Sequence, residues 1–261
     1  MDKLPVLFFG HGHPLNAIQK NDYTEALKKI GEKLPEPKAI MMVSAHWESR
    51  GTKVSTNPRP EVIYDFGNFN PELFTIKYPA KGSPEFAKLI RETVGTELIG
   101  EDNQMGFDHG SWTILKYIFP AAEVPVFQLS LDYTKPPEYH YELAKKLIPM
   151  RKKGLLIIGS GNIVHNLMMV DWKNRDAKPF DWVVEFDGIV KSNLMNSNHQ
   201  PLINYDKLGR AALKSIPTNE HYLPMLYIAA LQTKGEKIKF LYEGFEYAAI
   251  SQRGFMVSLE C

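Results

Sequence analysis

The sequence alternates short, nearly continuous apolar runs with longer stretches of helical periodicity, and this alternation constrains the fold more than any other feature. Apolar runs of strand length are typical of strands buried on both faces, and the segments between them supply the covering helices. We therefore predict an α/β fold with a central, mostly buried mixed sheet and helices on both faces. The expected core strands cover residues 5–9, 39–44, 124–131 and 155–159.

Apolar residues at three- and four-residue spacing mark the predicted helices, which cover residues 23–34, 84–94, 111–119, 139–150, 181–196 and 220–232. Two closing strands are expected over residues 237–242 and 247–259, with a hairpin around Glu243 and Gly244. A chain of 261 residues, 44% of them hydrophobic, can bury one large core. Because no repeat or linker-like tract interrupts it, we expect a single domain over residues 1–261.

The charges nearly cancel, with 31 Lys and Arg residues against 30 Asp and Glu residues. A net charge of +1 gives no field that would attract nucleic acid or an anionic membrane, so a small-molecule partner is expected. No apolar run reaches the roughly 18 residues of a membrane span, and the stretch at residues 4–9 is too short for a signal peptide. The single cysteine, Cys261, can form no intrachain disulfide. These features predict a cytoplasmic protein, and none of them indicates an oligomeric state.

Residues 50–81 form a long segment that is rich in Pro, Gly, Asn and aromatic residues. Long irregular loops in compact domains are commonly functional. We predict that this segment forms a wall or lid of the functional site.

Histidines follow several predicted strands at the point where each strand ends. His11 and His13 come just after the first strand, and His46 follows the second. His165 lies about one turn beyond a later strand. In open α/β sheets ligands bind outside the carboxyl ends of the strands, so these histidines are expected to meet there. The sequence therefore predicts a metal site at the carboxyl ends of the strands.

Two further histidines lie near the starts of predicted helices. His221 opens the last apolar helix, with Thr218 or Asn219 as the expected N-cap. His109 precedes a helix whose expected N-cap is Ser111. Both are polar residues next to apolar segments, so each needs a partner.

The remaining histidines, His140 and His199, lie in polar, exposed-looking segments, and we interpret them as surface or structural residues. Imidazole nitrogens suit zinc and iron, and a set without thiolates excludes a cysteine-based structural zinc site. The residues alone predict an open, catalytic metal site built from His11, His46, His165 and His221.

Five motifs occur along the chain in this order: GHGHP at His11, SAHW at His46, FDHGSW at His109, SGNIVHNL at His165 and EHYLP at His221. Together they resemble the class III extradiol dioxygenase superfamily, most closely its 4,5-DOPA dioxygenase extradiol branch. The resemblance extends over almost the whole chain. It implies an oxidoreductase with a single catalytic domain that opens the ring of a DOPA-like or other catechol with O2.

The resemblance also implies roles for the histidines. His11, His46 and His221 match the ligands of one divalent metal. His165 matches a catalytic acid/base that can also serve as a fourth ligand. His109 matches a catalytic histidine that contacts the substrate.

The substrate contacts are less closely defined by the motifs. His13 stands where the family commonly has Ser, so it stays open whether His13 is idle, donates a hydrogen bond to a residue that binds the metal, or competes as a ligand. We place it among the expected substrate contacts. Apolar walls for a flat ring are expected from nearby aromatic side chains, namely Trp47, Tyr64, Phe66, Phe69 and Trp112.

The chemistry of the metal leaves alternatives open. Ring cleavage requires a redox-active ion such as Fe(II), whereas an all-histidine ligand set is also typical of Zn(II). A zinc-dependent hydrolase would use a metal-activated water and His165 as base, and it would need no O2. A non-enzymatic metal-binding protein would have a closed coordination shell and no accessible pocket.

Overall fold

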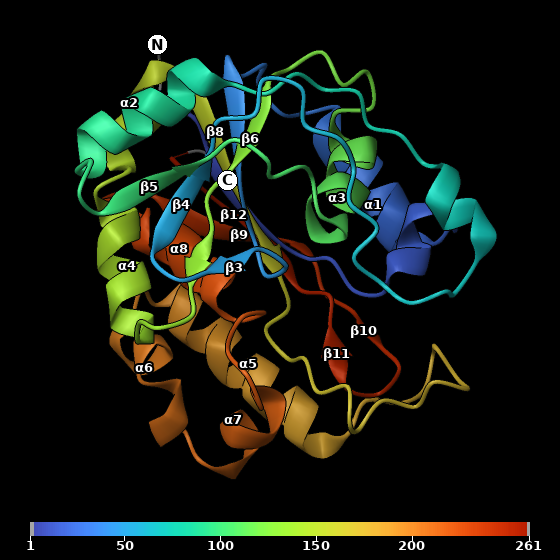
Figure 1. Cartoon of the computed structure of the whole chain (residues 1–261). Coiled ribbons are helices and arrows are strands. Elements are labelled where there is room, and N and C mark those ends of the chain that lie inside the picture. The colour runs from blue at the N-terminus through green and yellow to red at the C-terminus, as the bar shows by residue number, and fades with distance from the viewer. Residues whose placement is uncertain (1–2, 260–261) are drawn as a thin grey trace.

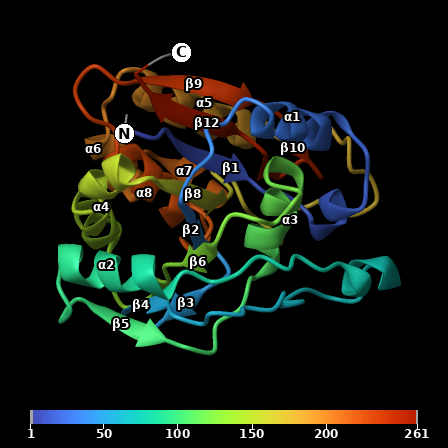
Figure 2. The same ribbon diagram turned by 90° about the horizontal axis from the view of Figure 1, so that it is seen from above.

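The computed structural model describes residues 3–259, so the expectation for Cys261 lies outside the described residues. At its centre is a six-stranded sheet made of β1 (Val6–Gly10), β2 (Ala39–Ser44), β6 (Val126–Gln128), β8 (Leu155–Gly161), β9 (Lys237–Tyr242) and β12 (Gly254–Ser258). Figure 1 shows the sheet at the centre of the molecule, and Figure 2 shows its strand order, β6-β2-β8-β1-β12-β9. The first four are parallel, whereas β12 is antiparallel to both of its neighbours. This mixed sheet confirms the predicted fold class.

Helices cover both faces of the sheet. In the described residues they are α1 (Asp22–Gly31), α2 (Pro84–Val94), α3 (His109–Ile118), α4 (Pro137–Lys145), α5 (Asp181–Met195), α6 (Gln200–Ile203), α7 (Arg210–Ser215) and α8 (Leu223–Ala230). Figure 2 shows α1 and α3 on one side of the sheet and α4 and α8 on the other. Within residues 3–259, no helix combines the length and the apolarity that crossing a membrane requires.

Strand β1 illustrates how one apolar run serves two layers. Successive side chains of a strand point to opposite faces of the sheet. Leu7 and Phe9 pack with α1 and α3, whereas Val6 and Phe8 pack with α8. All four side chains are completely buried, and each contributes roughly 1.5–3 kcal/mol to stability by leaving water. A polar residue at any of these positions would have no solvent to face, so the run is continuously apolar.

Smaller sheets flank the main one, and their strands are β3 (Glu48–Ser49), β4 (Thr52–Ser55), β5 (Ile99–Asp102), β7 (Leu131–Asp132), β10 (Phe245–Glu246) and β11 (Ile250–Ser251). β4 pairs with β5, so the segment predicted to be irregular over residues 50–81 begins with a strand. The predicted strand over residues 124–131 is interrupted between β6 and β7. Ser130 causes the break, because its backbone N–H donates to the carbonyl of Lys53 at 2.8 Å and leads the chain away from β2.

The two closing strands, β9 and β12, pair in antiparallel fashion. The predicted direct turn at Glu243 and Gly244 is wrong, because the β10–β11 hairpin is inserted between them. Tyr247 and Ala248 in this hairpin adopt left-handed φ angles of 52° and 62°. The hairpin places Glu246 beside the carboxyl end of β1, where its carboxylate accepts a hydrogen bond from the backbone N–H of His13.

Candidate active site

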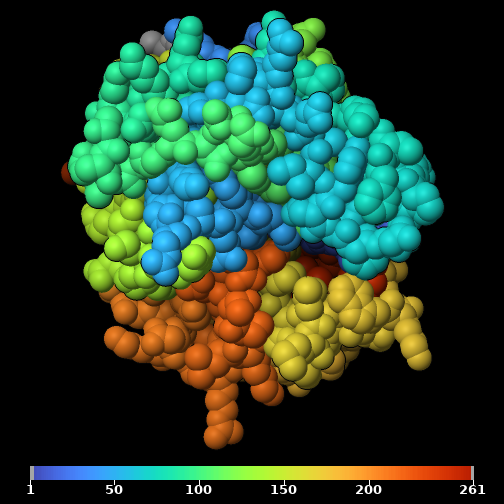
Figure 3. All heavy atoms as spheres, in the orientation of Figure 1, coloured from blue at the N-terminus to red at the C-terminus, as the bar shows by residue number. Residues whose placement is uncertain are grey.

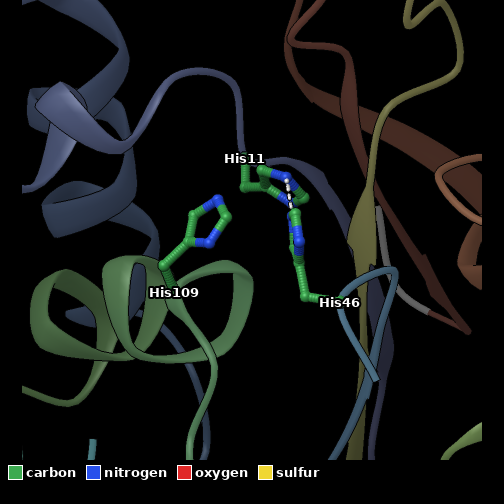
Figure 4. Close-up of side chains that lie close together, drawn as sticks. All are labelled: His11, His46 and His109. Atoms are coloured by element: carbon green, nitrogen blue, oxygen red, sulfur yellow. Dashed lines mark hydrogen bonds between the residues drawn. The ribbon is translucent and has the colours of Figure 1, made fainter. Parts of the chain in front are cut away.

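Three histidines meet at the carboxyl edge of the sheet. His11 directly follows β1, His46 lies two residues beyond β2, and His109 is the first residue of α3. One ring nitrogen from each lies within 4.8 Å of the others. Figure 4 shows the three rings directed toward a common point, and the Nε2 atoms of His11 and His46 are only 3.1 Å apart.

A second group, made of His165, Glu220 and His221, lies on the same edge. The imidazoles of His165 and His221 stack with centroids 3.5 Å apart and an interplanar angle of 8°. The His221 ring centroid is 4.9 Å from that of His46 and 5.4 Å from that of His11. The structure therefore brings all five motif histidines together, although the smallest group around His11 contains His109 rather than His221.

Hydrogen bonds fix the tautomer of His11. The hydroxyl of Ser160 donates to the carbonyl of Gly110 at 2.6 Å, so its oxygen must accept from Nδ1 of His11, 2.9 Å away. The proton of the neutral ring is thus on Nδ1, and Nε2 presents a lone pair. Such outer partners are typical of histidines that bind metals.

His221 is held in the same way. Its Nδ1 lies 3.0 Å from the Glu220 carboxylate, which can only accept a hydrogen bond, so Nδ1 carries the proton. Its Nε2 is buried and has no hydrogen-bond partner within residues 3–259. A buried lone pair without a partner is costly, which points to a group that the side chains themselves do not supply.

Asp65 connects His46 and His109. One of its carboxylate oxygens lies 3.4 Å from Nδ1 of His46 and 3.0 Å from Nδ1 of His109. The other oxygen accepts from the backbone N–H of His109 at 2.8 Å. Neither Asp65 nor Glu220 was predicted from the sequence as a site residue. Asp65 lies in the aromatic loop predicted to form a wall, but nothing in a single sequence distinguishes its carboxylate from the others.

Burial lowers the pKa of three histidines of the site. Burial lowers the pKa of His11 well below its usual value, and the nearby His46 and His109 lower it further. Burial also lowers the pKa of His221 well below its usual value, and it lowers that of His165 to about 4. At neutral pH these rings are unprotonated, which is the form that binds metals and accepts protons.

The donor set fits a divalent metal. Nε2 of His11 presents a lone pair toward Nε2 of His46, 3.1 Å away, and a cation held between the two nitrogens would satisfy both. Two nitrogens bound at about 2.1 Å to one ion lie roughly 2.9 to 3.4 Å apart, depending on the angle at the ion. The observed separation lies in this range.

A cavity of about 250 Å³ opens above the histidines. Besides the five motif histidines, its walls include His13, Asp65, Phe66, Phe69, Leu167 and Trp172. Figure 3 shows the surface hollowed between the cyan segment after β4 and the yellow segment between β8 and α5. Residues 65–69 line it, so the predicted loop does form a wall of the cavity.

Only part of the predicted wall faces the cavity. Phe66 and His13 line it, whereas Trp47, Tyr64 and Trp112 do not. Trp112 is completely buried and donates to the carbonyl of Ile63 at 3.1 Å. Trp112 therefore belongs to the core, because its helix face turns toward the sheet. The Tyr64 hydroxyl donates to the carbonyl of Ile76 at 2.8 Å, so it stabilises the loop.

Two details of the helix starts differ from the prediction. Asp108, not Ser111, caps α3, because its side chain accepts from the backbone N–H of Ser111 at 3.1 Å. His221 precedes α8, whose N-cap is Tyr222 rather than Thr218 or Asn219.

His140 lies away from the cavity, as does His199. Of the two roles expected for it, surface or structural, His140 has the structural one: it is completely buried between the Tyr227 hydroxyl and the carbonyl of Asp132, each 3.2 Å from one of its ring nitrogens. These contacts give it a structural role.

Residues 10–258 match the family model described as the catalytic LigB subunit of aromatic ring-opening dioxygenase. The chain belongs to the LigB family. It is 41% identical to "4,5-DOPA dioxygenase extradiol" of Escherichia coli (strain K12) over 253 residues, which cover 95% of this chain and 93% of that protein. It is 30% identical to "4,5-DOPA dioxygenase extradiol" of Beta vulgaris, with 94% and 93% of the two chains covered.

A solved structure agrees with this assignment. The crystal structure of an uncharacterized protein from Escherichia coli K12 has a TM-score of 0.86 and 38% sequence identity, and the match covers 98% of this chain and 100% of that one. Membership in the LigB family confirms the predicted enzyme class, an extradiol ring-cleavage dioxygenase.

Proposed function

We propose that this LigB-family enzyme uses a divalent metal and O2 to cleave the aromatic ring of a catechol. The observation that carries the proposal is the pair of Nε2 atoms of His11 and His46, which lie 3.1 Å apart in the wall of an accessible cavity. The names of the relatives support a catecholic substrate for this chain as well. We take residues 1–261 as a single catalytic domain, since the family match spans residues 10–258.

The proposed ligands are His11, His46 and His221. All three have Nδ1 within 3.4 Å of an oxygen of another side chain, and His221 Nε2 is buried without a partner among the described residues. When bound, a redox-active divalent metal supplies the electron transfer between an aromatic diol and O2. Fe(II) meets this requirement, whereas Zn(II) in the same ligands would give an inactive form.

His109 is the competing third ligand, because it belongs to the tightest group of ring nitrogens. Metal analysis of His221→Ala and His109→Ala separates the two assignments. We expect His221→Ala to lose the metal and His109→Ala to keep most of it. The opposite pattern would exchange their roles.

Proton transfer is assigned to His165, with His109 as a second candidate. His165 lines the cavity, and its low pKa leaves it neutral at pH 7, so it can accept a phenolic proton. Its ring rests on that of His221, which keeps it beside the ligand set. His165 can also serve as a fourth ligand. His109 projects from the start of α3 toward the same space, held by Asp65.

The cavity restricts the size of the substrate. Its volume of about 250 Å³ lies near the lower limit for small-molecule pockets, so a single aromatic ring with a short side chain fits it. Phe66 forms one apolar wall for such a ring.

Oxygen uptake tests the proposal directly. Protein purified without oxygen and reconstituted with Fe(II) is mixed with a small panel of catechols while O2 and the visible spectrum are recorded. We expect uptake coupled to a yellow ring-fission product, and none with His46→Ala. No uptake on any catechol despite verified iron loading would sink the proposal and favour zinc-dependent hydrolysis, for which esters and amides are the next substrates.

A further inference from the structure

Two charged residues, Glu246 and Arg175, hold the turn that carries His11, and we call this pair the clamp. The turn consists of His11, Gly12 and His13, which follow β1, and Gly12 adopts a left-handed φ of 64°. The carboxylate of Glu246 is buried, with 1% of the residue exposed, and it accepts a hydrogen bond from the backbone N–H of His13. A Cβ atom at Gly12 would collide with the same carboxylate, so the turn lies directly against it.

Arg175 reaches the turn from the segment between β8 and α5. Its Nη2 lies 3.4 Å from Oε2 of Glu246, and it also donates to the side-chain oxygen of Asn16. The side-chain amide of Asn16 donates in turn to the carbonyl of His11 at 3.4 Å. The contacts made by Glu246 and Asn16 therefore lie on either side of Gly12, and Arg175 connects them.

Further contacts anchor Arg175 outside the turn. The backbone N–H of Tyr247 donates to the carbonyl of Arg175 at 2.7 Å, and Nη1 of Arg175 donates to the side-chain oxygen of Gln19 at 2.6 Å. Neither Glu246 nor Arg175 lines the cavity. Any effect of the clamp on the reaction therefore acts through the turn and not through contact with the substrate.

Glu246 serves two donors, and only a carboxylate suits both of them. Burial raises the pKa of Glu246 to about 7, and Arg175 and the N–H of His13 oppose this rise, so the group is mostly ionised at pH 8. Its Oε1 then accepts from His13 while Oε2 faces the Arg175 guanidinium. A glutamine at this position has one acceptor oxygen and one NH2 group, so it would turn a donor toward one of the two donors.

We propose that Glu246 and Arg175 are positioning residues, which hold the turn after β1 in the conformation that directs Nε2 of His11 at the metal. The hydroxyl of Ser160 fixes the other ring nitrogen of His11, 2.9 Å away, so the position of Nε2 depends on where the backbone of the turn lies. This inference rests on the proposed function, because it takes His11 as a metal ligand. Loss of partners that orient a ligand usually weakens metal binding by about 10- to 100-fold.

The affinity for Zn(II) tests the proposal, because its measurement requires neither O2 nor a catechol. The dissociation constant of Zn(II) is measured at pH 8 by competition with a chromophoric chelator. We expect Glu246→Gln to raise this constant about 10-fold or more relative to the wild type. Arg175→Met keeps the carboxylate but removes the cation that faces it, and we expect it to raise the constant by a smaller factor.

The matched control is Glu236→Gln, the same exchange in a buried pair with Arg151 outside the cavity. We expect this variant to be less stable than the wild type but to bind Zn(II) equally well, so a loss of stability alone does not produce the expected result. An unchanged dissociation constant in Glu246→Gln, or an equal rise in Glu236→Gln, would overturn the role of the clamp.

Two further outcomes are distinguished from these. If Glu246→Gln does not fold, Arg175→Met decides in its place, because this side chain is 24% exposed and tolerates replacement more readily. An unchanged dissociation constant in Arg175→Met would then overturn the proposal. Failure of the wild-type protein to bind Zn(II) at all would instead count against the proposed function.

Discussion

Oδ2 of Asp65 lies 3.0 Å from Nδ1 of His109. Burial alone would raise the pKa of this carboxyl, but its contacts with His109 and His46 outweigh burial and lower the pKa below its usual value. Asp65 is therefore ionised at neutral pH, and one negative charge orients two histidines of the cluster. Partners of this kind usually influence a metal site almost as strongly as the ligands.

Replacing Asp65 by Asn removes the charge and keeps the size of the side chain. We expect kcat/KM on a catechol to fall about 10- to 100-fold, because the rings of His46 and His109 lose the negative charge that lies beside both. Steady-state kinetics of iron-loaded protein measures the effect. Asp22→Asn, an exposed residue in the first turn of α1, is the control and is expected to behave like the wild type. Equal activity of both variants would remove Asp65 from the site.

His46→Ala and His165→Ala are expected to fail in different ways. Loss of the His46 nitrogen should abolish metal binding, so metal analysis should find almost none after reconstitution. His165→Ala should retain at least part of the metal and lose about 10²- to 10⁴-fold in kcat, which is the usual loss for an acid/base residue. Normal turnover in either variant contradicts its assignment.

Gly161 controls the position of His221 from the end of β8. A Cβ atom at Gly161 would collide with the carbonyl oxygen of His221, which also accepts from the backbone N–H of Asn162 at 2.8 Å. We expect Gly161→Ala to displace His221 and to lower metal content and activity together. In Gly188→Ala, the matched control in α5, the new methyl group meets nothing within 4 Å, and a gain of up to about 1 kcal/mol is expected. Unfolding curves and metal analysis of both variants check the prediction.

Far from the site, Arg151 and Glu236 form a fully buried, two-pronged ion pair. Removing one partner leaves an uncompensated buried charge, so Glu236→Gln is expected to lower the free energy of unfolding by about 3 kcal/mol at pH 7. Glu142→Gln breaks an exposed pair with Lys145 and is expected to cost less than about 0.5 kcal/mol. Denaturant unfolding of the two variants distinguishes buried from exposed pairing.

The same pair predicts a pH dependence. Burial would raise the pKa of Glu236, but hydrogen bonds from Arg151 and from Thr233 outweigh it and lower the pKa from 4.5 to about 2. Because the folded-state pKa lies below the unfolded one, this stabilisation is present above pH 4.5 and is lost as the pH falls toward 2. The difference in unfolding free energy between wild type and Glu236→Gln should therefore shrink between pH 4.5 and pH 2. If the difference in unfolding free energy between the two proteins stayed constant over this pH range, the lowered pKa of Glu236 would be contradicted.

The main strands of the fold were predictable because a strand that is buried on both faces of the sheet has a continuously apolar sequence. The runs that contain Phe8, Met41 and Ile157 have no polar alternation, and each forms a strand of the central sheet. The point at which a strand ends was not predictable where a hydrogen bond to a distant residue ends it. Ser130 interrupts a long apolar run through a backbone hydrogen bond to Lys53, a residue distant in sequence.

The site was predictable where it depends on strand ends. His11, His46 and His165 follow strands, so the topology of the sheet brings them together. Asp65 and Glu220 were missed because a carboxylate acquires its role only from what it touches. Trp112 was misplaced because helical periodicity does not reveal which face of α3 turns toward the cavity.

The histidine cluster draws on positions from residue 11 to residue 221, and the last of these lies just before α8. Its other members follow β1, β2 and β8 or begin α3, so the cluster is assembled from segments spread along most of the chain. A growing chain on the ribosome therefore holds no complete version of it until nearly the whole polypeptide has emerged. Products of synthesis that end before His221 would lack one of the proposed ligands.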